Sequence, residues 1–492
     1  MKALEVSNGE SRSVFDLPRL EPDEFRARLA AAPAAGRRIS ALFGYRSEDG
    51  IELVSVLARD MLATFEISST RLTSTRLSSV TSDCPEAHLF EREIAESLGL
   101  ELDGHPFPRP VRFPGAGEKV GVTDFHRTDG EEVHEVAVGP VHAGVIEPGH
   151  FRFQCHGERV FQLDISLGYQ HRGVERALVG GPNKRTLHHM ETLAGDTSVG
   201  HATAYSQLIE GLTGVTPPAR ALGLRLIGLE LERLANHTGG LGALANDVGF
   251  LPTAAYCGRL RGEFLNLSAA LCGNRFGRGL IRPAGVGFDL DPSSVSVLDE
   301  RVMAAGRDVA GAVGLLWDTP SVQARFEDTG RVVQEVAKSL GLVGVAARAS
   351  GLKRDVRLTH PFGMYRFVRV PIATWPTGDV FARAYVRWLE IQRSVQLVRE
   401  QLAELPSGET RVELDTADIR PSSIAVSAVE GWRGEILHVA LTDQSGRFST
   451  YKIVDPSFHN WTGLSMALRG EQISDFPLCN KSFDLSYCGH DL

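Results

Sequence analysis

Residues 139–205 read GPVHAGVIEPGHFRFQCHGERVFQLDISLGYQHRGVERALVGGPNKRTLHHMETLAGDTSVGHATAY. A polar loop with two histidines, His142 and His150, opens this stretch, and apolar residues then alternate with polar ones as they do in β-strands. After residue 173 the pattern becomes helical. Charged groups here stand beside apolar strand and helix patterns, which is where a scaffold can hold a site. We therefore expect the rest of the chain to be organised around this stretch.

The composition is that of a large folded protein. The chain has 492 residues, 42% of them hydrophobic, and a formal net charge of −9. This length predicts about two to four domains. The two signs of charge are mixed along the chain, which argues weakly against a nucleic-acid binder. We find no apolar leader at the start and no stretch of about 18 uncharged apolar residues, so we expect neither a secretory signal nor a membrane span.

Cysteine usage points to a reducing compartment. The six cysteines are scattered over a long chain, which makes a disulfide framework improbable. No Cys-x-x-Cys pair is present, and this removes the usual spacings of zinc, iron–sulfur and nickel sites. The cysteines are Cys84, Cys155, Cys257, Cys272, Cys479 and Cys488.

The predicted elements define an α+β fold in two domains. Residues 1–120 predict an α/β domain, and a connector rich in proline and glycine places its boundary near residue 120. Residues 121–492 predict a larger, mostly helical domain with antiparallel β elements. The expected elements are a helix at 25–32, strands at 38–43 and 51–57, an acidic helix after residue 84, β structure at 133–165, helices at 186–212, 221–238 and 379–405, an antiparallel sheet at 424–454 and a last helix near 464–468.

Several motifs resemble a known family. GPVH at 139–142, EPGHFR at 147–152 and HRGVE at 171–175 are similar to the group 4 nickel–iron hydrogenase large subunit of formate hydrogenlyase. They also resemble the forty-nine-kilodalton, quinone-site subunit of respiratory complex I. In the first domain, EREI at 91–94 and GHP at 104–106 resemble the thirty-kilodalton subunit of complex I, whose implied role is docking partners. The resemblance implies that these two complex I subunits are fused in one chain.

The resemblance also identifies what is absent. In the hydrogenases, two Cys-x-x-Cys pairs hold the nickel–iron centre, and their four positions fall here on Ala194, Thr197, Ser486 and Gly489. Alanine and glycine offer no ligand atom, and hydroxyls are poor ligands for a soft metal. We therefore predict that the chain binds no metal and has no functional nickel–iron centre. A genuine hydrogenase with atypical ligands, using Cys479 and Cys488, is the alternative.

In the complex I branch, the same cavity holds a quinone headgroup. The resemblance implies contact by a tyrosine, which here is Tyr205, and by a histidine of the first loop, which is His150 or His142. A phenol can bond a quinone carbonyl and donate a proton. Asp196 can orient a histidine or relay protons. For each of these residues a purely structural role remains open.

Charged residues form two further groups. Glu230, Arg233 and His237 match a family segment that continues to Asp247, and we expect them to form an internal polar network with His171 and Arg172, because buried charges need partners. Arg348 and Arg357 flank an aspartate in another family segment. Either arginine faces the cofactor site or the partner's cluster, or both belong to a structural salt-bridge network.

The resulting hypothesis is a peripheral subunit of a membrane oxidoreductase at the cytoplasmic face. This chain alone would bind no cofactor and have no activity. A small partner subunit would carry an iron–sulfur cluster, and antiporter-like membrane-arm subunits would complete the complex. Electrons would pass from that cluster to an acceptor at the interface, for which quinone is the expectation. A non-catalytic scaffold that kept the fold is the third possibility.

Overall fold

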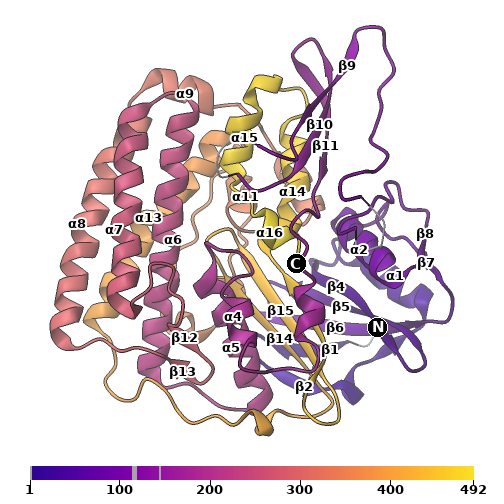
Figure 1. The fold of residues 1–492 in the computed structure, drawn as a ribbon, viewed down its shortest axis with the longest axis horizontal. Helices are drawn as coiled ribbons and strands as arrows, with labels where there is room; N and C mark the ends of the chain where they lie inside the picture. The colour runs from indigo at the N-terminus through magenta and orange to yellow at the C-terminus, as the bar shows by residue number, and fades with distance from the viewer. Residues whose placement is uncertain (1–2, 114–118, 143–145) are drawn as a thin grey trace.

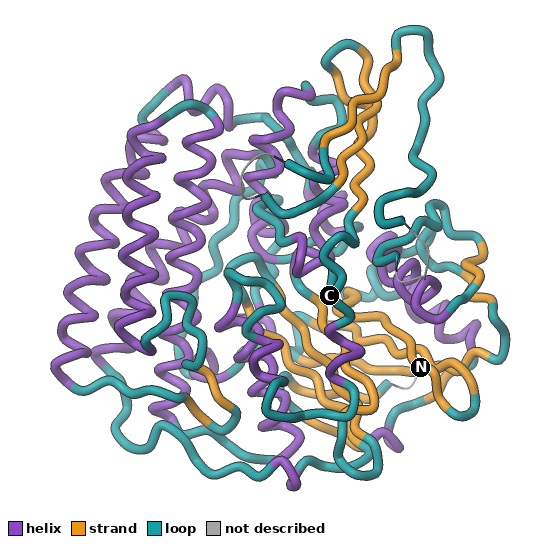
Figure 2. The backbone as a smooth tube through the Cα atoms, viewed as in Figure 1, coloured by secondary structure: helices purple, strands orange, loops and turns teal. Residues whose placement is uncertain are grey.

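The computed structural model describes residues 3–113, 119–142 and 146–492. Three parts are visible in Figure 1: a helical bundle on one side, a central antiparallel sheet, and a second sheet that contains the N-terminus. A narrow β-ribbon projects above them. Figure 2 separates the helical and the β parts clearly. The mixture of helix and sheet that the sequence predicts is confirmed.

The N-terminal sheet has the strand order β1-β6-β5-β4, with β3 parallel to β6. The predicted helix at 25–32 and the strands at 38–43 and 51–57 are confirmed as α1, β4 and β5. Helix α2 ends at Gly99, whose φ of 68° suits glycine. The elements are β1 (Leu4–Ser7), β3 (Arg19–Leu20), α1 (Pro22–Ala31), β4 (Arg38–Ser47), β5 (Gly50–Arg59), β6 (Thr64–Leu72), β7 (Arg76–Ser78), α2 (His88–Leu98) and β8 (Glu101–Asp103).

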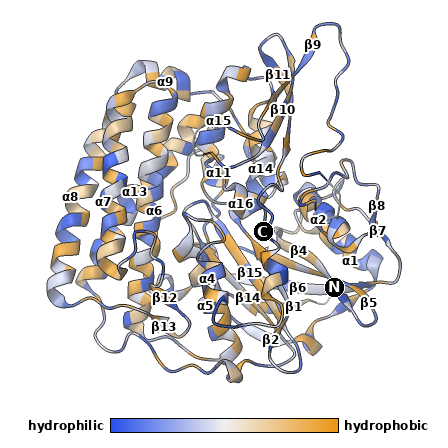
Figure 3. Ribbon diagram, viewed as in Figure 1, coloured by the Kyte–Doolittle hydropathy of each residue, from blue (hydrophilic) through white to orange (hydrophobic). Residues whose placement is uncertain are grey.

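The central sheet joins the two ends of the chain. Its order is β16-β15-β14-β2, so the N-terminal strand β2 (Ser11–Ser13) pairs with β14 (Ser423–Glu430). Strand β15 (Glu435–Thr442) lies between β14 and β16 (Phe448–Val454), as the alternation at 424–454 predicts. Figure 3 shows β14 and β15 as mostly hydrophobic, and both strands are buried along their length. The sheet is therefore part of the common core.

The bundle consists of α6 (Ala219–Asp247), α7 (Leu251–Cys272), α8 (Pro292–Trp317) and α13 (Val380–Ala403). Helix α6 is longer than the predicted 221–238. It continues through Gly239 and Gly242, where a Cβ would lie 2.8 Å from Arg261 and 2.7 Å from Cys257 of α7, so glycine permits the close packing. Helix α13 confirms the prediction at 379–405, and Asp379 caps it by accepting the N–H of Ala382 at 2.8 Å. Helices α7 and α8 were not predicted.

One predicted helix is wrong. The sequence predicts continuous helix over 186–212, but the structure has α4 (Thr186–Met190) and α5 (Ser198–Thr213). The segment between them is fixed by side chains from elsewhere in the fold: Trp432 Nε1 donates to the carbonyl of Asp196 at 3.1 Å. Glu232 accepts the first N–H groups of α5, from Val199 at 2.7 Å and Gly200 at 3.1 Å. These tertiary contacts outweigh local helix propensity.

The remaining elements frame the tail and the ribbon. The ribbon has the order β11-β10-β9 and confirms the β structure predicted at 133–165. The last helix predicted near 464–468 ends α14, and two short helices follow it. The elements are β9 (Val133–Val138), β10 (His150–His156), β11 (Arg159–Ser166), α3 (Val174–Leu178), β12 (Ile281–Arg282), β13 (Gly285–Val286), α9 (Pro320–Phe326), α10 (Gln334–Ser339), α11 (Gly344–Ala349), α12 (Val356–Thr359), α14 (Pro456–Ala467), α15 (Phe476–Phe483) and α16 (Tyr487–His490).

Candidate functional site

The centre of the candidate site is Arg433, in the turn between β14 and β15. Gly431 and Gly434 close this turn with reciprocal backbone hydrogen bonds of 2.8 and 3.1 Å. At Gly434 the φ is 143°, and a Cβ there would lie 2.7 Å from the Cα of Gly344, so glycine is required. The turn thus packs against the neighbouring backbone and holds Arg433 in one place.

The Arg433 guanidinium joins two segments far apart in sequence. It donates to both carboxylate oxygens of Asp196, at 2.7 and 2.8 Å, and its Nε donates to the carbonyl of Asp484 at 2.5 Å. It also stacks on the Trp432 ring, 3.9 Å from the centroid. A bidentate arginine–carboxylate pair is strong and geometrically specific. Arg433 therefore connects segment 194–197 to the tail segment 484–489.

The charges at this junction support one another. Burial alone would lower the pKa of Arg433, but the charge and the hydrogen bonds of Asp196 outweigh burial and raise it. Burial would raise the pKa of Asp484, yet the cations Lys481, Arg387 and Arg433 bring it down to about 2. The Arg433 guanidinium and the Asp484 carboxylate are therefore both charged at neutral pH.

None of the four ligand positions, 194, 197, 486 and 489, offers a thiolate. Thr197 Oγ1 accepts hydrogen bonds from Trp432 Nε1 at 3.2 Å and Arg433 Nη1 at 3.3 Å. Ser486 Oγ accepts the N–H of Gly489 at 2.9 Å. A Cβ on Gly489 would lie 2.6 Å from the carboxylate carbon of Asp455. Ala194 is buried and has no polar side-chain atom. This donor set does not fit a nickel–iron centre held by four cysteines.

Two cysteines lie in the tail, but neither is a ready ligand. Cys488 Sγ is 3.3 Å from Ser486 Oγ, and burial together with the charge of Glu147 raises its pKa to about 12. Cys479 is buried, and burial raises its pKa to about 12 as well, despite the nearby Arg383. Metal binding uses the thiolate form, which these environments disfavour.

An open groove of about 760 Å³ lies beside the Arg433–Asp196 pair, and Asp196 lines it whereas Arg433 does not. One wall carries polar groups, and the other is formed by α6 and α7, mostly by small residues together with Asn236, Asn246, Leu251 and Arg261. The volume of the groove is within the range of small-ligand pockets. Its lining includes Asp196, Trp432, Lys481 and Asp484 on the polar side and Asn236, Gly239, Gly240, Ala243, Leu251, Ala254 and Gly258 on the helical side.

The residues that were predicted to contact a quinone do not all lie in the groove. Asp196 lines the groove, whereas Tyr205 is 4% exposed, lies in the core between α5 and the central sheet, and does not line it. Burial raises the pKa of Tyr205. His142 bonds the carbonyl of Gly149 at 2.9 Å and His150 bonds that of Gly139 at 3.2 Å, so both histidines brace the first loop. Neither makes a hydrogen bond or ring contact to Tyr205 among the described residues.

The polar network forms around Glu390 of α13. Its carboxylate accepts from Arg348 at 2.6 Å, His237 at 2.8 Å and Arg233 at 3.3 Å. Arg357 contacts Glu230 at 3.2 Å and Asp355 at 2.7 Å. Both predicted cofactor arginines, Arg348 and Arg357, are buried in these ion pairs. Neither arginine reaches an exposed surface of this chain, as a structural salt-bridge network requires.

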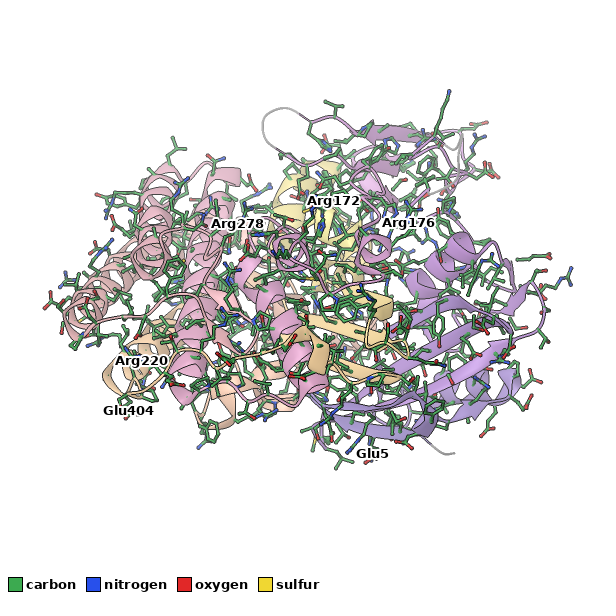
Figure 4. The ribbon with its side chains drawn as sticks, turned by 60° about the horizontal axis from the view of Figure 1, so that its bottom comes forward. Glu5, Arg172, Arg176, Arg220, Arg278 and Glu404 are labelled. Atoms are coloured by element: carbon green, nitrogen blue, oxygen red, sulfur yellow. The ribbon has the colours of Figure 1, made fainter. Side chains whose placement is uncertain are left out.

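Three residues expected in that network lie elsewhere. His171 contacts the backbone carbonyl of Asp491 at 3.3 Å. Arg172 is exposed, as Figure 4 shows, and donates to the carbonyls of Thr192 and Leu193. Asp247 is exposed at the end of α6. His171 and Arg172 lie in another segment of the chain and Asp247 lies at the exposed end of α6, so none of the three joins the buried network.

Sequence reasoning missed two residues of the site. Arg433 begins an Arg-Gly-Glu segment at 433–435 that also resembles the family, which was a detectable signal, but no pattern indicates that its side chain reaches Asp196. Glu147 belongs to the matched EPGH segment, and its carboxylate accepts the backbone N–H groups of Tyr487 and Cys488, both at 3.3 Å. This contact attaches the first loop to the tail.

The fold and the paired segments 194–197 and 484–489 define a hydrogenase-like large subunit, and comparison with known proteins agrees. Residues 247–491 match the family described as respiratory-chain NADH dehydrogenase, 49 kDa subunit. The carbon monoxide-induced hydrogenase of Rhodospirillum rubrum is 30% identical over 355 residues, covering 71% of this chain and 97% of the relative. Formate hydrogenlyase subunit 5 of Escherichia coli is 30% identical over 433 residues, covering 83% and 76%.

A quinone-linked relative matches as well. NADH-quinone oxidoreductase subunit 4 of Thermus thermophilus is 29% identical over 378 residues, covering 72% of this chain and 92% of the relative. The chain belongs to the family that unites this complex I subunit with the large subunits of group 4 hydrogenases. Its relatives support an oxidoreductase role in general. Among the described residues, no helix is both long and apolar enough to cross a membrane.

Proposed function

We propose that this chain is the large subunit of a membrane-associated, complex I-like oxidoreductase complex and that it works without a nickel–iron centre. In this proposal, electrons pass from an iron–sulfur cluster on a small partner subunit to an acceptor in the groove beside Arg433. The acceptor is a quinone, as the resemblance to the complex I branch implies. The observation that carries the proposal is the Arg433–Asp196 ion pair, which lies between the two segments that bear the family's cysteine positions.

Two features support the absence of the metal centre. The four ligand positions hold no thiolate, and a guanidinium with its cationic charge contacts both ligand segments. A cation at this point opposes a second cation, because like charges at close range repel strongly in a partly buried site. The carboxylate of Asp455 also fills the space that a side chain at position 489 would need.

The groove supports a planar acceptor. Quinone reduction places negative charge on the ring oxygens, and a preorganised cation beside them stabilises that charge. Arg433 and Lys481 are cations on this side, and the Lys481 side chain is 35% exposed. Each quinone reduced takes two electrons and two protons, and Asp196, with a side chain 35% exposed, is a carboxyl group within the groove. In this proposal, Asp196 replaces Tyr205 as the polar residue nearest the acceptor.

The proposal extends to the rest of the complex. Residues 1–120 would have the docking role that their resemblance to the thirty-kilodalton subunit implies, and membrane-arm subunits would hold the complex at the cytoplasmic face. The second candidate is a non-catalytic scaffold. One observation favours it: Nε, Nη1 and Nη2 of Arg433 all donate to protein acceptors, so a ligand must compete for them.

The first test is the metal content of the native membrane complex, measured by mass spectrometry. We expect iron without nickel, and one nickel per complex would overturn the proposal. The second test reduces the complex with a viologen dye and follows reduction of a water-soluble ubiquinone analogue. Turnover that is lost in Asp196→Asn and retained in Glu400→Gln, an exposed control, supports the acceptor site. No turnover in the wild-type complex supports the scaffold.

A further inference from the structure

Four buried side chains behind the candidate site form a continuous hydrogen-bonded chain. Tyr451 Oη lies 2.9 Å from His438 Nδ1, His438 Nε2 lies 3.1 Å from His201 Nδ1, and His201 Nε2 lies 3.2 Å from Asp455 Oδ2. Tyr451 and His438 come from neighbouring strands β16 and β15, and His201 from α5. The exposed fractions are 3% for Tyr451, 1% or less for the histidines and 1% for Asp455.

The acceptor end of this chain is fixed by Asp455. Its Oδ1 accepts the N–H of Ser457 at 2.8 Å, which caps α14. Burial raises the pKa of Asp455, but hydrogen bonds from His201 and Ser457 and the charge of Arg433 act in the opposite direction, and the pKa is lowered. An ionised carboxylate can only accept hydrogen bonds. His201 Nε2 must therefore carry the hydrogen.

The other hydrogens follow in order. In a neutral His201, Nδ1 has no hydrogen and accepts from His438 Nε2–H. His438 Nδ1 then accepts the hydroxyl hydrogen of Tyr451. In this arrangement, every ring nitrogen and the hydroxyl hydrogen have a partner, and all three donors point toward Asp455. Burial lowers the pKa of His438, which agrees with a neutral ring there.

A protonated His201 breaks this order. Its Nδ1 would become a donor, so His438 would have to change tautomer and donate to Tyr451, and the Tyr451 hydrogen would lose its acceptor. A buried donor without a partner is unfavourable. The other titratable groups around the chain are Tyr205 beside Tyr451 and Arg433, Cys488 and His459 around Asp455. Among these only Arg433 is a fixed cation.

We propose that Tyr451 and His438 are positioning residues that hold His201 in its neutral Nε2–H tautomer. Because His201 then carries no positive charge, the negative charge of Asp455 remains available to stabilise Arg433. The location supports this role, because the Asp455 carboxylate packs directly against Gly489, one of the four ligand positions. This inference rests on the proposed function, in which Arg433 stands beside the acceptor. It adds a hydrogen-bonded chain that lies outside the groove and determines which nitrogen of each histidine carries the hydrogen.

The test is nitrogen NMR of the full-length chain with ¹⁵N-labelled histidine, with His438→Asn used to assign the His438 signals. We expect both His201 and His438 to be neutral and to carry hydrogen on Nε2. In Tyr451→Phe the preference of His201 for its neutral state is lost. Without the Tyr451 hydroxyl, Nδ1 of His438 has no partner whether His201 is neutral or protonated. The ¹⁵N signals of His201 should then shift toward those of a ring with hydrogen on both nitrogens.

Tyr365→Phe is the matched control. It removes another buried tyrosine hydroxyl, which donates to Glu230 at 2.6 Å, and should leave both histidine tautomers unchanged. Hydrogen on Nδ1 of His438 in the wild-type chain overturns the proposal, even if Tyr451→Phe does not fold. An unshifted His201 in a folded Tyr451→Phe chain overturns it as well.

The assembled complex gives an independent readout. Because a disturbed chain alters the charge beside Arg433, the acid limb of the pH profile of quinone reduction should move to higher pH in Tyr451→Phe. An unmoved limb would oppose the positioning role. The NMR result does not depend on the acceptor, and the nickel measurement does not depend on the histidines. Failure of this inference is thus distinguishable from failure of the proposed function.

Discussion

At the scale of single residues, Arg433 determines the character of the candidate site. It supplies one positive charge between the two segments that resemble the ligand segments of hydrogenases, and its partners come from both of them. Asp196 belongs to the first segment and Asp484 to the second. The side chain thus acts as a covalently attached cation that connects them, and its removal should affect both the stability of the chain and the acceptor reaction.

We predict that Arg433→Met lowers the free energy of unfolding by about 2 kcal/mol. Breaking a fully buried ion pair typically costs about 3–5 kcal/mol, but water reaches Asp196, whose side chain is 35% exposed, and reduces the effect. Chemical denaturation of the full-length chain measures the change. Arg433→Lys keeps the positive charge without the bidentate geometry, so the stability of this variant should lie between those of the wild type and Arg433→Met. A Met variant as stable as the wild type would contradict the bridging role.

The residue scale is also where sequence reasoning reached its limit. The motifs predict that segments 194–197 and 484–489 belong to one site, because both resemble ligand segments, and Arg433 contacts both segments. They did not indicate side-chain direction. Tyr205 is only eight residues after Thr197, yet two turns of α5 carry it into the core. Such directions depend on helix phase and on tertiary contacts, which one sequence does not display.

At the scale of elements, the contact between α6 and α13 depends on buried charge. Glu390 on α13 accepts hydrogen bonds from Arg233 and His237 of α6 and from Arg348. Burial would raise its pKa, but Arg348 and His237 hold it well below the usual range. The i, i+3, i+7 spacing of Glu230, Arg233 and His237 predicted such a network. Glu390 itself was hidden within the apolar repeat of α13.

We predict that Glu390→Gln destabilises the chain by about 3–5 kcal/mol near pH 7, because three buried cationic or donor groups lose their carboxylate. Glu400→Gln, on the exposed side of the same helix, is the matched control and should change stability by less than about 0.5 kcal/mol. Denaturant titrations give both values. A small effect of Glu390→Gln would mean that the neighbouring carboxylates Glu430 and Asp355 take over its partners.

The same carboxylate predicts a pH dependence. The pKa of Glu390 is lowered in the folded chain, so its stabilising contribution is complete above the unfolded pKa of about 4.3 and is lost as the pH falls toward the folded pKa. The difference in unfolding free energy between wild type and Glu390→Gln should therefore be constant from about pH 6 to 8 and shrink below about pH 4. Denaturation at several pH values measures this difference. A constant difference down to about pH 3 would contradict the assignment.

At the scale of the whole molecule, the two ends of the chain share one core. Strand β2 pairs with β14, Arg38 of β4 donates to Glu435 of β15 at 2.8 Å, and Lys452 of β16 donates to Glu93 of α2 at 2.7 Å. The connector rich in proline and glycine predicts a domain boundary near residue 120, which stays a prediction. Pairing between distant strands and ion pairs between distant residues lie beyond what local patterns display.

These contacts predict the outcome of limited proteolysis. Arg127 is exposed, and it lies before β9 in a segment without regular structure, so trypsin should cleave there early. The two fragments should nevertheless elute together in gel filtration, because the buried Arg38–Glu435 and Lys452–Glu93 pairs and the β2–β14 pairing still connect them. In Arg38→Met, which leaves the buried Glu435 and the partly buried Asp60 without their cation, the nicked chain should separate more readily under mild denaturant. Fragments that separate in native buffer would show that residues 1–120 form an independent unit.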